Sequence, residues 1–170
     1  PSDPGRIRVL IVDDHPVVRL GLRALLERQT GFEVVGEAGS VVSAIEEAQR
    51  LRPDVVLLDV RLPDGKGYEA CRQIHQRVPD VRVLFLTSFA DEQTVLESLD
   101  AGGDGYLLKE IDESALVRAV RSVGMRLAVT PTWLASKCGA SLSSTLRTFQ
   151  TTASALKAEP SWNFTPGRSL

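Results

Sequence analysis

Long apolar runs are missing from this 170-residue sequence. No run approaches the roughly 20 residues that a helix needs to cross a bilayer, which argues against an integral membrane protein. Residues 1–5 also lack an initiator methionine and the apolar segment of a secretory signal. We therefore expect a cytoplasmic protein without a membrane partner, in which residues 1–6 are a disordered start.

Cysteine is scarce as well. The two cysteines, Cys71 and Cys138, have neither a pairing pattern nor a metal-ligand spacing with the two histidines, His15 and His75. This argues against a disulfide scaffold and a structural zinc site, and we expect two free thiols.

The first three quarters of the chain lack an excess of positive charge. Up to Gly124 the sequence has 15 basic and 21 acidic residues, a net charge of −6, whereas from Met125 onward it has 5 basic residues and one acidic residue. Nucleic-acid binding rests largely on neutralising phosphates with lysine and arginine. The composition therefore predicts no direct DNA binding by this chain.

The residues before Gly124 alternate between strand-like and helix-like patterns. The expected strands are Ile7–Val12, Phe32–Ala38, Val55–Asp59, Val83–Leu86 and Gly105–Leu108. The helices between them are expected from apolar stripes, which are Val17, Leu20, Ala24 and Leu25; Val41, Ala44, Ile45 and Ala48; Cys71, Ile74 and Val78; Val95 and Leu99; and Leu116, Ala119, Val120 and Val123. Five strands alternating with five helices predict an α/β fold with a parallel sheet covered on both faces.

Four of the predicted strands end in residues suited to one chemistry. Asp13 and Asp14 follow the first strand, and Asp59, Thr87 and Lys109 end the third, fourth and fifth. In an open parallel sheet the ligand site lies beyond the carboxyl ends of the strands, so these groups should converge. Crowded carboxylates need positive charge among them, and an all-oxygen donor set is what Mg²⁺ prefers.

An aspartate in such a site can act as a phosphoryl acceptor. We predict that Asp59 is this acceptor, that the Lys109 ammonium pairs with a phosphoryl oxygen, and that the Thr87 hydroxyl donates to another. Each residue also has a simpler interpretation when it is considered alone. An aspartate pair before proline is typical of a capping turn, Thr87 could cap a helix and Lys109 could be a solvated charge. In the same way, Tyr106 is more typical of packing, and His15 of a turn or the surface, than of a ligand.

Taken together, these motifs resemble the receiver domain of two-component response regulators over about residues 7–123. The residues that carry the resemblance are Val12-Asp13-Asp14-His15, Leu58-Asp59-Val60, Leu62-Pro63-Asp64-Gly65, Leu86-Thr87-Ser88 and Ala101-Gly102-Gly103-Asp104-Gly105-Tyr106-Leu107-Leu108-Lys109. Asp13-Asp14-His15-Pro16, Val35-Gly36-Glu37-Ala38, Arg61 and Gly105-Tyr106 most resemble the NarL/FixJ branch, including the dormancy-type regulators of actinobacteria.

The resemblance implies a flavodoxin-like, doubly wound sheet of five strands in the order 2-1-3-4-5. It also implies that Asp59 takes its phosphoryl group from a sensor histidine kinase and that Mg²⁺, or Mn²⁺, lies among Asp13, Asp14, Asp59 and the backbone carbonyl of Arg61. Thr87 and Tyr106 would form a conformational switch, and the chain would form a homodimer on phosphorylation. Such a domain is a signalling module and not an enzyme in the usual sense.

The segment 124–170 does not continue this pattern. Members of the NarL/FixJ branch have a helix-turn-helix DNA-binding domain there, whereas residues 125–170 contain 14 serines and threonines and no sustained stripe. We expect an irregular, disordered tail, and we hypothesise a frameshifted or aberrant terminus. DNA binding would then be a property of full-length relatives only.

Two other functions remain open from the residues alone. One is a binding or dimerisation module that works without phosphorylation, although every side chain required for phosphorylation is present. The other is a phosphohydrolase of the haloacid dehalogenase type, which also uses an aspartate and magnesium. That class needs a second acidic residue two positions after the nucleophile, where this chain has Arg61.

Overall fold

Five parallel strands form the centre of the fold in the computed structural model, which describes residues 5–88 and 91–125. The strands of this sheet are β1 (Ile7–Val12), β2 (Phe32–Ala38), β3 (Val55–Leu58), β6 (Arg82–Thr87) and β7 (Gly105–Leu108). Their order is β2-β1-β3-β6-β7, which is 2-1-3-4-5 when only these strands are counted. The predicted α/β class and strand order are confirmed.

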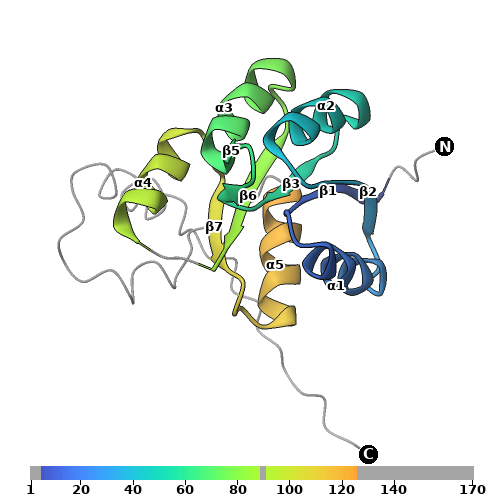
Figure 1. The fold of residues 1–170 in the computed structure, drawn as a ribbon. Helices are drawn as coiled ribbons and strands as arrows, with labels where there is room; N and C mark the ends of the chain where they lie inside the picture. Colours follow the sequence, from blue (N-terminus) through green and yellow to red (C-terminus); the bar gives the residue numbers. More distant parts are fainter. Residues whose placement is uncertain (1–4, 89–90, 126–170) are drawn as a thin grey trace, which may run out of the picture. The chain divides into compact units, whose positions relative to one another are not determined.

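Helices cover both faces of the sheet. Figure 1 shows α1 and α5 on one face and α2, α3 and α4 on the other. The helices are α1 (Pro16–Glu27), α2 (Val41–Leu51), α3 (Gly67–Arg77), α4 (Glu92–Asp100) and α5 (Glu113–Gly124). Strands covered in this way are apolar along their whole length, because neither face contacts water. All four residues of β3 are accordingly buried.

Side-chain caps define where three of the helices begin. Ser40 accepts a hydrogen bond from the Ser43 amide at the start of α2, and Asp91 and Asp112 do the same for Thr94 and Ala115. Caps of this kind satisfy amides that have no partner inside the helix. The helices α2, α4 and α5 therefore begin directly after residues whose side chains cap them.

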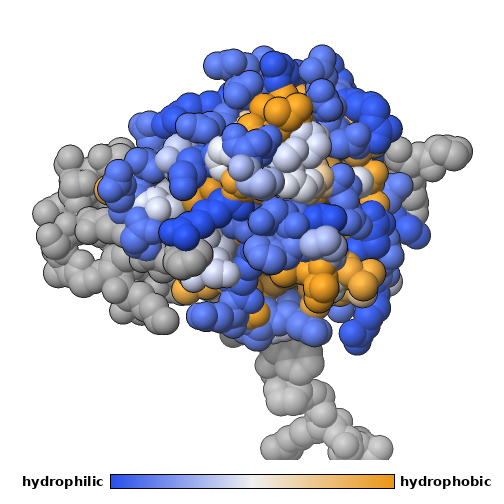
Figure 2. Space-filling model, viewed as in Figure 1, coloured by the Kyte–Doolittle hydropathy of each residue, from blue (hydrophilic) through white to orange (hydrophobic). Residues whose placement is uncertain are grey.

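The stripe predicted for the first helix is wrong in part. Val17 and Leu20 are 80% and 66% exposed, and Ala24 is exposed too, so that only Leu25 of the predicted set is buried. In the region where Figure 1 places α1, Figure 2 shows apolar surface among hydrophilic neighbours. Because α1 is apolar around much of its circumference, the spacing alone did not determine which side packs against the sheet.

Two further features extend what the sequence indicated. The acceptor-strand loop contains a short antiparallel hairpin formed by β4 (Arg61–Leu62) and β5 (Gly65–Lys66). The last helix includes Gly124, one residue beyond the predicted domain boundary. Residues 126–170 of the predicted tail, including Cys138, lie outside the described residues. Among the helices that the structure describes, none is long and apolar enough to cross a membrane.

Candidate functional site

The carboxyl ends of four neighbouring strands bring the predicted site residues together. Asp13 follows β1, Asp59 follows β3, Thr87 ends β6 and Lys109 follows β7. Backbone hydrogen bonds to the neighbouring strands hold Asp59 and Lys109 in line with the sheet. The Asp59 amide donates to the Val12 carbonyl at 2.8 Å, and the Lys109 amide donates to the Thr87 carbonyl at 2.8 Å.

An ammonium group lies between two buried carboxylates at this edge. Lys109 Nζ is 2.5 Å from Asp13 Oδ2 and 2.6 Å from Asp59 Oδ2. Asp13 and Asp59 are 2% and 5% exposed, so water can do little to stabilise their charges. Burial lowers the pKa of Lys109, but the hydrogen bonds and charges of Asp13 and Asp59 outweigh it, and the pKa lies above its ordinary value. The Lys109 ammonium is therefore paired with two carboxylates inside the crevice. The simpler interpretation, in which Lys109 is a charge surrounded by water, does not fit this arrangement.

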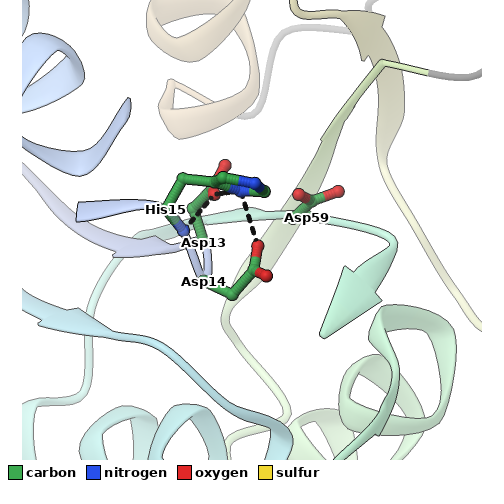
Figure 3. Close-up of side chains that lie close together, drawn as sticks. All are labelled: Asp13, Asp14, His15 and Asp59. Atoms are coloured by element: carbon green, nitrogen blue, oxygen red, sulfur yellow. Dashed lines mark hydrogen bonds and ion pairs between the residues drawn. The ribbon is translucent and has the colours of Figure 1, made fainter. Parts of the chain in front are cut away.

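His15 joins the carboxylate cluster from the first turn after β1. Its Nδ1 is 3.1 Å from Asp13 Oδ1 and 2.7 Å from Asp14 Oδ1, and its backbone amide donates to Asp13 Oδ1 at 2.9 Å. Figure 3 shows the ring beside both aspartates, on the side of Asp59. The sequence favoured a turn or surface histidine. His15 is indeed 66% exposed, but its ring nitrogen is directed into the cluster.

Close backbone packing holds the acceptor loop in place. The Gly67 amide donates to the Val60 carbonyl at 2.8 Å, and a Cβ atom at Gly67 would lie only 2.1 Å from the Asp59 carbonyl oxygen. A larger residue would therefore push this loop away from the strand. Asp64, in the same hairpin, accepts hydrogen bonds from the Val41 and Val42 amides at 2.7 and 3.1 Å. Asp64 thereby connects the loop after Asp59 to the start of α2.

Thr87 and Tyr106 are in contact inside the protein. They are 0% and 1% exposed, and the Tyr106 ring centroid lies 6.4 Å from that of Phe85. Burial and the charge of Asp91 raise the pKa of Tyr106 to about 12, although its hydrogen bond with Thr87 acts in the opposite direction. The conformational switch predicted for Thr87 and Tyr106 is a change between two states, and in this structure the Tyr106 ring is buried.

A crevice of about 260 Å³ lies beside Asp59, Lys109 and His15. Its lining is formed by Asp14, His15, Asp59, Arg61, Leu62, Pro63, Ser88 and Lys109. We did not predict Ser88 as a site residue. Its position directly after Thr87, at the end of a strand, was the signal that could have indicated it. The predicted acceptor, Asp59, thus has access to a ligand from solvent.

The donor set suits a divalent cation. One ligand atom from each of Asp13, Asp14, His15 and Asp59 can be chosen so that all four lie within 4.8 Å of one another. Carboxylate oxygens are the ligand atoms that Mg²⁺ and Mn²⁺ prefer. Arg61, whose backbone carbonyl is a predicted ligand, has its amide 3.3 Å from Asp59 Oδ1.

A doubly wound sheet with acidic residues and a lysine at its strand ends defines a class of α/β domains that bind charged ligands at this edge. The chain belongs to the response regulator receiver domain family, whose model matches residues 9–121. This membership supports the receiver interpretation over the phosphohydrolase alternative.

Curated relatives agree with this family. The chain is 49% identical over 118 residues to the DNA-binding transcriptional activator DevR/DosR of Mycobacterium tuberculosis. The aligned region covers 69% of this chain and 54% of that protein. It is 44% identical over 115 residues to the response regulator protein VraR of Staphylococcus aureus. This aligned region covers 68% of this chain and 55% of VraR. The chain thus spans about half the length of these relatives.

Solved structures with the same fold include two regulators of the predicted branch. A two-component response regulator of the LuxR family from Aurantimonas has a TM-score of 0.73 and 34% identity, covering 78% of this chain and 94% of that one. The signal receiver domain of a NarL regulator from Mycobacterium tuberculosis has a TM-score of 0.69 and 32% identity, covering 72% and 98%. The predicted resemblance to this branch is confirmed.

Proposed function

We propose that Asp59 accepts a phosphoryl group from a sensor histidine kinase. We further propose that Mg²⁺ or Mn²⁺ is held by Asp13, Asp14, Asp59 and the backbone carbonyl of Arg61. The observation that carries this proposal is the Asp59 carboxylate itself, which opens into the crevice and contacts the Lys109 ammonium. Membership of the receiver family supports the same assignment.

The transfer is a displacement at phosphorus. A carboxylate oxygen of Asp59 forms the new P–O bond while the P–N bond to the kinase histidine breaks, and the electron pair of that bond stays on the histidine nitrogen. The bound cation supplies positive charge that offsets the charge on the phosphoryl oxygens. Lys109 exchanges a carboxylate partner for a phosphoryl oxygen, so its charge remains compensated throughout.

The switch begins at Thr87, which lies one strand away from the acceptor. The phosphoryl group adds about −1.5 to −2 charges and new acceptor oxygens. The Thr87 hydroxyl then donates toward a phosphoryl oxygen, which favours the arrangement with Tyr106 buried. For such an element the coupling to a distant surface is typically about 1–3 kcal/mol. The output surface formed by α4, β7 and α5 would report this shift.

Several properties follow from this proposal. The chain forms a homodimer on phosphorylation, and its own catalysis is at most self-phosphorylation from small donors and slow self-dephosphorylation. The net charge of −6 over residues 1–124 supports an output without direct DNA contact by this domain. Control of DNA binding would require a further domain, and this chain covers 54% of the relative whose name includes DNA binding. The proposed location is the cytoplasm, where a kinase domain could reach Asp59.

Incubation with Mg²⁺ and acetyl phosphate tests the acceptor. We expect the wild-type chain to gain the mass of one phosphoryl group and to respond to beryllofluoride with a change in oligomeric state. Asp59→Asn should do neither, because an amide oxygen is a poor nucleophile. Intact mass spectrometry and size-exclusion chromatography measure the two outcomes.

Asp100→Asn is the matched control. Asp100 is 81% exposed at the end of α4, so this variant should behave as the wild type does. If Asp59→Asn and the wild type are phosphorylated equally, the acceptor assignment is wrong. If neither responds while both are folded, the chain is a binding module that works without phosphorylation.

A further inference from the structure

His15 occupies a helix-capping position without capping the helix. It precedes Pro16 at the start of α1, and its side chain makes no capping hydrogen bond. The imidazole is instead directed toward Asp13 and Asp14, and its Nδ1 lies within 3.1 Å of a carboxylate oxygen of each. Because its backbone amide also holds Asp13, the ring has a defined place beside the carboxylates.

The spacing of these atoms suits a shared cation. Adjacent ligands of an octahedral ion with bonds of about 2.1 Å are separated by about 3.0 Å. His15 Nδ1 is 2.7 Å from Asp14 Oδ1 and 3.1 Å from Asp13 Oδ1, and the set that includes Asp59 lies within 4.8 Å. When the ring carries its proton on Nε2, the Nδ1 lone pair is directed into this space. The His15 side chain is 66% exposed, so the ring is not enclosed by the protein.

We propose that His15 is a ligand of the metal and sets the preference of the site among metals. This inference rests on the proposed function, because it assumes the cation site at Asp59. Mg²⁺ prefers oxygen donors, whereas imidazole nitrogen favours the first-row transition ions, whose affinities rise along the series from Mn²⁺. A site that adds one nitrogen to its carboxylates therefore gains affinity for Mn²⁺ relative to Mg²⁺.

Metal titration of the full 170-residue chain tests the preference. Mn²⁺ binding is followed by electron paramagnetic resonance and Mg²⁺ binding by calorimetry, at one fixed pH. We expect His15→Gln to weaken Mn²⁺ binding about tenfold or more, the size of effect typical of groups around a metal, and to change Mg²⁺ binding much less. His75→Gln is the control, because His75 lies on α3 against the Gly102 carbonyl and should leave both affinities unchanged.

A spectroscopic measurement on the unmutated chain makes the test independent of folding. Pulsed electron paramagnetic resonance of bound Mn²⁺ should show the coupling of a directly coordinated ¹⁴N nucleus in the wild type and in His75→Gln. The same signal should be lost in His15→Gln. Its absence from the wild type would overturn the assignment of His15 as a ligand.

The variant Asp14→Asn separates this inference from the proposed function. If Asp14→Asn weakens Mn²⁺ binding but His15→Gln leaves the ratio of Mn²⁺ to Mg²⁺ affinity unchanged, the metal site stands and the role of His15 is wrong. If Asp14→Asn leaves Mn²⁺ binding unchanged, the metal site is wrong and the inference is overturned with it.

Discussion

Lys109 acts as the resident positive charge of the site. Its ammonium contacts carboxylates from two strands, and one of them, Asp13, is almost completely buried. Removing a partner from a buried ionic group leaves a charge that neither water nor protein stabilises. The same ammonium lines the crevice, where we propose that it pairs with a phosphoryl oxygen.

We predict that Lys109→Ala abolishes the response to beryllofluoride but leaves the protein folded. The free energy of unfolding should fall by about 1–3 kcal/mol because Asp13 and Asp59 lose their cation. Added Mg²⁺ should restore part of this loss, since a divalent ion can replace the missing charge. Urea unfolding with and without Mg²⁺ measures both effects.

The exposed Lys66, on β5, offers the comparison for this experiment. Lys66→Ala should change the free energy of unfolding by no more than about 0.5 kcal/mol and should keep the beryllofluoride response. Complete unfolding of Lys109→Ala in the presence of Mg²⁺ would instead indicate a mainly structural lysine.

At the scale of the elements, ion pairs connect α1 to β2 on the side of the helix that packs against the sheet. The Glu37 carboxylate, on β2, accepts hydrogen bonds from Arg23 Nε at 2.6 Å and Arg19 Nε at 3.1 Å. Arg19 also donates to the Asp13 carbonyl at 2.6 Å, which connects the helix to the site loop. With both arginines directed toward β2, Val17 and Leu20 are left on the solvent side. The side that packs inward therefore carries these arginines together with the buried Leu25 and Leu26, and it shares only Leu25 with the predicted stripe.

The Glu37 network should make stability depend on pH. The hydrogen bond from Arg23 lowers the pKa of Glu37 in the folded protein, against the smaller opposing effect of burial. A carboxylate with a lowered folded pKa contributes stability above its unfolded pKa of roughly 4.3, and that stability is lost as pH falls through the folded value. Glu37→Gln should therefore lower the free energy of unfolding by about 1 kcal/mol at pH 7.

The difference between Glu37→Gln and the wild type should shrink as the solution is made more acidic than the unfolded pKa. Urea unfolding at a series of pH values measures it. Glu33→Gln, a change of the same kind on the same strand, serves as the comparison and should have a smaller effect at neutral pH. A difference for Glu37→Gln that stays constant at every pH would contradict the proposed ion pairs.

At the scale of the whole molecule, the last helix closes the fold on the first strands. The Arg121 guanidinium lies 4.8 Å from the centroid of the Phe32 ring and donates to the Thr30 carbonyl at 3.1 Å. Leu116, Val120 and Val123 are buried on α5. All described residues fall within a single compact unit. The core should therefore be complete at the end of α5.

We predict that a fragment of residues 5–125 unfolds in one transition with the same free energy of unfolding as the full chain, within about 1 kcal/mol. Circular dichroism during urea unfolding measures this. A second fragment that ends at Ser114 lacks the buried residues of α5 and should not fold. A larger loss of stability in the 5–125 fragment would show that the remaining residues support the domain.

The sequence by itself was sufficient for the order of strands and helices along the chain and for grouping most of the residues that the structure brings to one edge of the sheet. Strand and helix periodicities record which side chains are buried, and capping residues such as Ser40 mark boundaries, so both can be recognised locally. Asp13, Asp59, Thr87 and Lys109 could be grouped from their places at strand ends alone, because the carboxyl ends of parallel strands meet at one edge.

Only the tertiary structure decided how these groups face one another. The Lys109 and Asp59 side chains meet across 50 residues of sequence, and the His15 ring turns toward the carboxylates although its neighbours in sequence suggested a surface turn. The rotation of α1 and the burial of Tyr106 likewise depend on contacts between segments that are distant in the chain. Such contacts depend on how distant segments pack and on which charges they bring together. A local pattern of residues gives no information about either.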